Sequence, residues 1–183
     1  MLLTGPPRCG KSTVIERVVS RIGKPIRGFF TRELREGGKR TGFSILTLDG
    51  RKGLLAHQDM KARYRVGKYG VNLRDIDEIA VPSMIPKDRD ETIVIDEIGK
   101  MECLSRSFRE ALLEVLDSQN PVIGTIALKG DRFIQQIKQR KDVLLMEVTE
   151  KNRNELVDCP LFYEPYGTSR EEGHDYGNLS VVR

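Results

Sequence analysis

Residues 4–13 read Thr-Gly-Pro-Pro-Arg-Cys-Gly-Lys-Ser-Thr, and this stretch decides the fold. From Gly5 to Ser12 it fits the pattern Gly-x-x-x-x-Gly-Lys-Ser/Thr at every defined position. The apolar segment Met1–Thr4 comes before it, and apolar residues recur at helical spacing from Lys11 to Ile22 after it. A strand, a glycine-rich loop and a helix in this order form a phosphate-binding loop. Its backbone N–H groups and the helix N-terminus face the phosphate oxygens.

Each side chain of this loop has an expected role. A Cβ at Gly10 would collide with a bound phosphate, so the position requires glycine. Lys11 is expected to reach the β- and γ-phosphates as a catalytic charge, and the Ser12 hydroxyl is expected to bind Mg²⁺. The predicted nucleotide-binding residues of the loop are therefore Gly5, Pro6, Pro7, Arg8, Cys9, Gly10, Lys11, Ser12 and Thr13.

A second chemical signature follows the apolar segment Thr92–Ile95, which ends in Asp96 and Glu97. Asp96 is predicted to bind the metal together with Ser12, and Glu97 to accept a proton from the attacking water. The predicted nucleotide site at this strand end comprises Asp96, Glu97, Ile98, Gly99 and Lys100. With the loop, this pair of carboxylates predicts a Mg²⁺-dependent phosphohydrolase.

The residues 96–99 also fit the Asp-x-x-Gly pattern of switch GTPases. Such proteins read guanine with Asn-Lys-x-Asp after a later strand, and the nearest candidate here is residues 128–131, Leu-Lys-Gly-Asp. Because Leu128 cannot make the hydrogen bonds of that asparagine, the sequence argues against guanine specificity.

Two basic residues are candidates for a charge that stabilises the transition state. Lys100 and Arg132 could act as an internal arginine finger does, or could lie exposed on the surface.

Other residues have both a nucleotide-binding and a structural interpretation. Thr149, Asn152 and Arg153 follow the last predicted strand, where they could contact base or ribose, and Thr149 could instead cap a helix. Phe29 and Phe30 could stack on a base or pack in the core. Cys9 could be a reactive thiolate, favoured by the positive loop, or a small apolar core residue.

Apolar runs alternate with amphipathic segments along the chain. Strands are predicted at residues 1–4, 26–34, 42–48, 52–57, 92–95, 121–128 and 143–148. Helices are predicted at residues 11–22, 75–85 and 131–139, in a segment opened by a capping box of Ser107 and Glu110, and in a short segment from residue 150. This order predicts an α/β fold with a mainly parallel sheet flanked by helices, and an antiparallel hairpin insertion near residues 26–57.

Composition sets limits on the class of protein. The 183 residues are 38% hydrophobic and 32% charged, which is typical of a soluble globular domain. We expect a domain at residues 1–158, an irregular tail at 159–183, a cytoplasmic location and no membrane span. Three widely separated cysteines indicate neither a zinc site nor a disulfide framework. The net charge of +4 is scattered and aromatic residues are few, so a nucleic-acid partner is possible but not favoured.

With these residues in place, the chain resembles a family of small P-loop nucleoside-triphosphatases, which includes the human cancer-related nucleoside-triphosphatase and its thermophile relatives. Asp96-Glu97-Ile98-Gly99-Lys100-Met101-Glu102 resembles the family's D-E-I-G-K-M-E. Further similar segments are residues 4–13, 28–35, 41–43, 65–71 and 149–153. Three departures stand out. Arg8 replaces a glycine that is usual in the loop, and Arg32 replaces one acid of a family pair. The tail beyond Val157 matches no segment of the family, so no role is carried over to it.

The resemblance implies a RecA-like P-loop core that hydrolyses ATP, GTP, CTP and UTP slowly with Mg²⁺, to diphosphate and phosphate, with little base selectivity. Two alternatives stay open from the sequence. One is a nucleotide or small-molecule kinase, which would need an acceptor pocket. The other is a binding module controlled by nucleotide.

Overall fold

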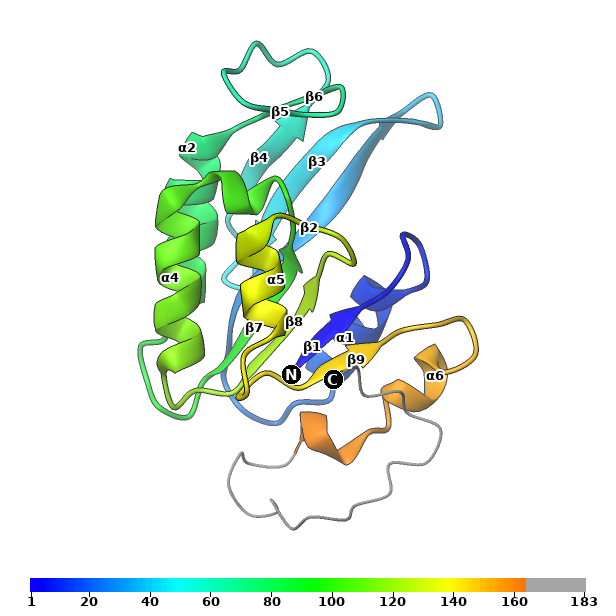
Figure 1. The fold of residues 1–183 in the computed structure, drawn as a ribbon, viewed down its shortest axis with the longest axis vertical. Helices are drawn as coiled ribbons and strands as arrows, with labels where there is room; N and C mark the ends of the chain where they lie inside the picture. The colour runs from blue at the N-terminus through cyan, green and yellow to red at the C-terminus, as the bar shows by residue number, and fades with distance from the viewer. Residues whose placement is uncertain (164–183) are drawn as a thin grey trace.

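The computed structural model describes residues 1–163, which form one sheet covered by helices on both faces (Figure 1). The strand order in the sheet is β5-β6-β4-β3-β2-β7-β8-β1-β9. The strands are β1 (Leu2–Thr4), β2 (Ile26–Glu36), β3 (Lys39–Thr47), β4 (Lys52–His57), β5 (Arg65–Val66), β6 (Tyr69–Val71), β7 (Thr92–Ile98), β8 (Val122–Ile126) and β9 (Leu145–Glu147). The α-helices are α1 (Lys11–Val19), α2 (Leu73–Asp75), α3 (Val81–Met84), α4 (Arg106–Asp117), α5 (Arg132–Lys138) and α6 (Arg153–Leu156).

The sheet has a parallel half and an antiparallel half. Strands β2, β7, β8, β1 and β9 run parallel, as the alternation of strands and helices predicts. The antiparallel half contains the predicted hairpins at residues 26–57, formed by β2, β3 and β4. The two halves of the sheet share β2. Its first residues, Ile26–Phe30, pair with β7 in the parallel half, and Phe29–Glu36 pair with β3 in the antiparallel half. The antiparallel half also extends beyond residue 57, because β6 and β5 continue the sheet.

Successive residues of the central strands point to opposite faces and so build two cores. On one face, Leu2 and Phe29 pack with α4 and α5. On the other face, Leu3 and Phe30 pack with α1 and α6. Because Phe29 is fully buried and Phe30 is 6% exposed, both phenylalanines are core residues, and the idea that one of them stacks on a base is wrong.

Two predicted helices differ in detail from the sequence pattern. The segment expected at residues 75–85 begins earlier, and a π-helical stretch, η1 (Ile76–Ala80), links α2 to α3. The predicted capping box of Ser107 and Glu110 is wrong. With Ser107 as the cap the helix would begin at residue 108, but α4 begins at Arg106 and its cap is Ser105. The Ser105 hydroxyl accepts the Phe108 N–H at 3.0 Å, and Glu110 forms an ion pair with Arg106 at 2.7 Å instead.

The chain remains packed beyond the predicted boundary at residue 158. Cys159 and Phe162 are buried in the core beside α1, and the short 3₁₀ helix η3 (Pro160–Phe162) follows α6. This part of the predicted tail is therefore ordered against the domain, while residues 164–183 lie outside the described residues. A 3₁₀ turn, η2 (Glu102–Leu104), connects β7 to α4. Within residues 1–163, no helix is long and apolar enough to cross a membrane.

Candidate functional site

The chemical signatures meet at the carboxyl edge of the parallel strands, where ligands bind in open α/β sheets. The glycine-rich loop follows β1, and Asp96 and Glu97 lie near the end of β7. Strand β8 lies between these two strands and brings Thr125 to the same edge. The peptide bond between Asp96 and Glu97 is cis.

The loop keeps its shape through residues with positive φ and through the Lys11 side chain. Gly10 has φ 106°, and Gly5 has φ 149°. A Cβ on Gly5 would lie 2.5 Å from the Val148 carbonyl oxygen, so only glycine lets the loop start against β9. The Lys11 ammonium donates to the carbonyls of Gly5 at 3.1 Å and Pro6 at 3.2 Å. It therefore lies across the mouth of the loop, on the side where β- and γ-phosphates are expected.

Arg8 is the residue within 1–163 that adopts a positive φ without being a glycine, with φ 67°. A left-handed conformation costs an L-residue about 1 kcal/mol or more. We therefore expect Arg8→Gly to raise the free energy of unfolding by about 0.5 kcal/mol in urea denaturation, because the relief of roughly 1–2 kcal/mol of strain exceeds the entropy cost of about 0.5–1 kcal/mol for an unfolded glycine. Arg8→Ala is the matched control because it removes the charge and keeps the strained φ. If both variants raised the free energy of unfolding equally, the gain would come from removing the charge of Arg8 and not from its backbone conformation.

Asp96 is the buried acceptor of the site. It is 1% exposed, and its Oδ1 accepts the hydroxyls of Thr125 at 2.6 Å and Ser12 at 3.2 Å. Burial raises the pKa of this carboxyl, and the two hydroxyl hydrogen bonds act against that rise. The contact with Ser12 joins residues 84 positions apart, which brings the loop and the β7 carboxylate into one site.

The donor set fits a magnesium ion. Asp96 Oδ2 is buried and makes no hydrogen bond within residues 1–163, so one carboxylate oxygen has no partner. A hard cation prefers such oxygen ligands, and in phosphate-loop proteins one hydroxyl and one carboxylate suffice because the phosphates supply further oxygens.

Arg32 and Thr125 were missed from the sequence as parts of this site. Arg32 lies over the Phe30 ring at 4.8 Å and forms an ion pair with Glu16 at 2.7 Å. Its positive charge lowers the pKa of Asp96. The signal for Thr125 is a polar residue in an otherwise apolar strand, but only the strand order reveals its contact with Asp96.

Glu97 lines a pocket of about 240 Å³. Burial raises the pKa of Glu97, the positive charge of Lys11 lowers it in opposition, and the Asp96 carboxylate adds to the rise. Lys100 and Lys129 also line the pocket, whose apolar wall includes Phe43 and Met101. A group that accepts a proton and a space beside it for a reactant therefore occur together.

Glu102 also lines this pocket. It had no role assigned from the sequence. It is 4% exposed, and a Cβ on Gly99 would lie 2.7 Å from its Oε2 and 3.5 Å from Glu97 Oε1. The two carboxyl groups thus approach each other around Gly99. Burial, with repulsion from Glu97, raises the pKa of Glu102 to about 8.

The raised pKa of Glu102 predicts a loss of stability at high pH. Between the ordinary pKa of 4.5 and about 8, the folded protein holds a proton that the unfolded chain releases, so stability falls as pH rises. From pH 5 to pH 9 the wild type should lose about 4 kcal/mol more unfolding free energy than Glu102→Gln, measured by urea denaturation. Glu114→Gln, an exposed control, should follow the wild type. If the unfolding free energy of Glu102→Gln fell with pH as steeply as that of the wild type, Glu102 would not be the group with the raised pKa.

Of the remaining predicted residues, some line the pocket and others lie on the surface or in the core. Lys100 lies at the pocket with Glu97, whereas Arg132 is exposed in the first turn of α5 and does not line the pocket. Cys9 is 7% exposed and packs in the core beside α1, which favours its interpretation as an apolar residue over a reactive thiolate.

Thr149 and Asn152 bind each other. Asn152 Oδ1 accepts the Thr149 N–H at 2.8 Å, and Thr149 Oγ1 accepts the Asn152 N–H at 3.3 Å. Asn152 Nδ2 donates to the Glu147 carbonyl at 2.9 Å. These two side chains therefore hold the loop after β9, and Arg153 alone of the three has an exposed side chain without a hydrogen bond in residues 1–163.

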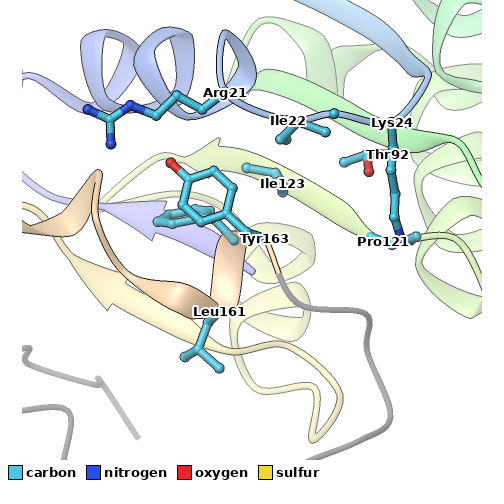
Figure 2. Close-up of a pocket in the computed structure, with 10 residues that line it drawn as sticks. Arg21, Ile22, Lys24, Thr92, Pro121, Ile123, Leu161 and Tyr163 are labelled. Carbon is cyan, nitrogen blue, oxygen red and sulfur yellow. The ribbon is translucent and has the colours of Figure 1, made fainter.

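A second pocket, of about 90 Å³, lies at the opposite edge of the sheet (Figure 2). Thr92 and Pro121, at the starts of β7 and β8, line it together with Lys24 and Tyr163. Because it is at the amino ends of the strands, it is separate from the carboxylates and the loop.

Comparisons with known proteins agree with this geometry. A family model described as NTPase matches residues 1–159. The nucleoside-triphosphatase THEP1 of Thermotoga petrophila is 45% identical over 178 residues, which cover 97% of this chain and 98% of that protein. The similarity to this relative therefore continues into the tail.

Two solved structures share the fold. The crystal structure of THEP1 from Aquifex aeolicus has a TM-score of 0.81 at 33% identity and covers 90% of this chain and 99% of its own. The solution structure of the human cancer-related nucleoside triphosphatase has a TM-score of 0.73 at 35% identity, with coverages of 86% and 93%. The resemblance inferred from the motifs is confirmed, and the chain belongs to the NTPase family that includes these proteins.

Proposed function

We propose that this protein hydrolyses nucleoside triphosphates at the β–γ phosphoanhydride, with Mg²⁺ and with little selectivity for the base. The observation that carries the proposal is the contact of Ser12 with Asp96, beside Glu97 and Lys11. It supports the proposal because the side chains that we assign to the metal, to the water and to the phosphates come from segments that meet at the carboxyl ends of the parallel strands. The names of the relatives as nucleoside-triphosphatases support the same activity.

The reaction assigns one role to each side chain. The water oxygen forms a bond to the γ-phosphorus while the bond from that phosphorus to the β–γ bridging oxygen breaks. Glu97 accepts the proton of the water, for which it must be ionised, and the charge of Lys11 favours that ionised form. Lys11 and the loop N–H groups bind the phosphate oxygens on which negative charge grows.

Ser12 and Asp96 would hold Mg²⁺, which when bound neutralises charge on the β- and γ-phosphates. Thr125 positions the Asp96 carboxylate by its hydrogen bond of 2.6 Å to Oδ1. That bond leaves Oδ2 available to the cation or to a water of its shell.

The proposal predicts comparable hydrolysis of the four common nucleotides. Leu128 is 41% exposed and offers no hydrogen bond to guanine, and the Asn152 amide is already bonded within its own loop. We expect kcat/KM for ATP, GTP, CTP and UTP to agree within about tenfold, a free-energy difference of about 1.4 kcal/mol. Phosphate release with and without Mg²⁺ measures this. A preference for one base above about a hundredfold would contradict the proposal.

The pocket beside Glu97 favours a second candidate, phosphoryl transfer to a bound hydroxyl. Its volume of about 240 Å³ far exceeds the ~30 Å³ that one water occupies. In that reaction Glu97 would accept the proton of the hydroxyl, and the acceptor would take the γ-phosphoryl group. Nucleoside diphosphate formed in excess of free phosphate, in the presence of added acceptors, would identify it. Equal amounts of the two products indicate hydrolysis.

A further inference from the structure

Arg153, the first residue of α6, lies beside the phosphate loop. In the sheet, β1 lies between β9 and β8, and β7 lies beyond β8. The loop after β1 therefore has Glu97 on one side and the segment after β9 on the other. Because Glu97 and Lys11 mark the γ-phosphate end, the nucleoside must leave toward β9 and α6.

Arg153 lies against the phosphate loop on that side. A Cβ on Gly10 would be 3.1 Å from Arg153 Cδ and 3.7 Å from its Nη1, so the arginine stem runs beside the bare glycine backbone. The side chain is exposed, and its guanidinium forms no hydrogen bond or ion pair with another described residue. A planar cation is thus available next to the place where a nucleoside would lie.

Hydrogen bonds hold the backbone of Arg153 and the turn that precedes it. The Arg153 N–H donates to the Thr149 carbonyl at 3.1 Å, and the mutual hydrogen bonds of Thr149 and Asn152 close the same turn. Arg17 of α1 donates to Asn154 at 3.2 Å, which joins the helix of the phosphate loop to α6. These bonds hold the backbone of Arg153 close to the helix that follows the phosphate loop.

On these contacts we propose that Arg153 is the stacking platform for the nucleobase, an inference that rests on the proposed function. A guanidinium plane stacks on the face of any base and reads none of its hydrogen-bonding groups. The Asn152 amide and the Thr149 hydroxyl are engaged within their own turn, so they do not read the base edge. Binding through one flat cation accounts for low base selectivity.

The test separates the base from the phosphates. Calorimetry measures the Kd of non-hydrolysable ATP and GTP analogues and of inorganic tripolyphosphate, all with Mg²⁺. Arg153→Ala should raise the Kd of both analogues about tenfold and change that of tripolyphosphate less than twofold. Arg153→Tyr should restore the analogues to within about threefold of the wild type, because a ring also stacks, and Arg153→Lys should not.

Lys151→Ala is the matched control, since Lys151 is an exposed cation of the same turn, and it should bind all three ligands as the wild type does. A parallel loss of tripolyphosphate binding in Arg153→Ala would overturn the inference and assign Arg153 to the phosphates. Restoration by Lys but not by Tyr, or an unchanged Kd in a folded Arg153→Ala, would also overturn it. Failure of the wild type to release phosphate from bound nucleotides would refute the proposed function, whereas the analogue binding tests the platform on its own.

Discussion

Lys11→Ala should lower kcat/KM for ATP by about 10³-fold and weaken triphosphate binding. The Lys11 ammonium donates hydrogen bonds to the Gly5 and Pro6 carbonyls, which position its charge at the phosphate loop. An alanine removes the side-chain cation expected between the β- and γ-phosphates and so weakens the stabilisation of charge in the transition state. Phosphate release at several nucleotide concentrations gives both kinetic constants.

Lys24→Ala is the control for the loss of a lysine. Lys24 is exposed and lines the pocket at the opposite sheet edge, so its removal should leave kcat/KM unchanged. Circular dichroism should show the same fold for both variants. Turnover near that of the wild type in Lys11→Ala would mean that the phosphates bind elsewhere, and the proposed site would be wrong.

The parts of the site that are contiguous in the chain could be predicted from the sequence. The loop at 5–13 and the carboxylates at 96 and 97 follow apolar strands directly, so a local pattern specifies both residue type and position at the sheet edge. That the two segments meet follows from the parallel order of strands, since carboxyl ends then lie at one edge.

Contacts between distant segments could not be predicted in this way. The bond from Thr125 to Asp96 depends on β8 lying beside β7, so a polar residue in an apolar strand marks Thr125 but does not identify Asp96 as its partner. The burial of Glu102 depends on the turn at Gly99 and on the pocket wall, so the motif that contains it does not reveal its raised pKa.

The secondary-structure predictions that differ from the structure fall where two local sequence patterns compete. Ser105 and Ser107 are both plausible caps, and Ser107 with Glu110 has the better spacing for a capping box. The fold selects Ser105, because the chain leaves the η2 turn there and Phe108 enters the core. Similarly, a hairpin pattern in residues 26–57 hides the fact that the first half of β2 is a parallel core strand.

Glu97→Gln should retain nucleotide binding and lower kcat by about 10²- to 10⁴-fold, the usual effect of removing a general base. The amide has nearly the same shape as the carboxyl but cannot accept the proton of the water. Asp96→Asn is the informative neighbour, because it changes a predicted metal ligand and should mainly raise the Mg²⁺ concentration needed for half-maximal rate. The two carboxylates are adjacent in sequence, so this difference in phenotype separates their roles.

The pH dependence of kcat gives an independent check on Glu97. Burial raises the pKa of its carboxyl above the ordinary glutamate value, and only the ionised form accepts a proton, so the wild-type rate should fall as pH drops through that raised pKa. In Glu97→Gln this acid limb should disappear along with most of the rate, while the affinity for a non-hydrolysable analogue stays within a few fold. If Glu97→Gln kept more than about a tenth of the rate and the same acid limb, Glu97 would not be the base, and the proton would have to pass to another acceptor at the pocket.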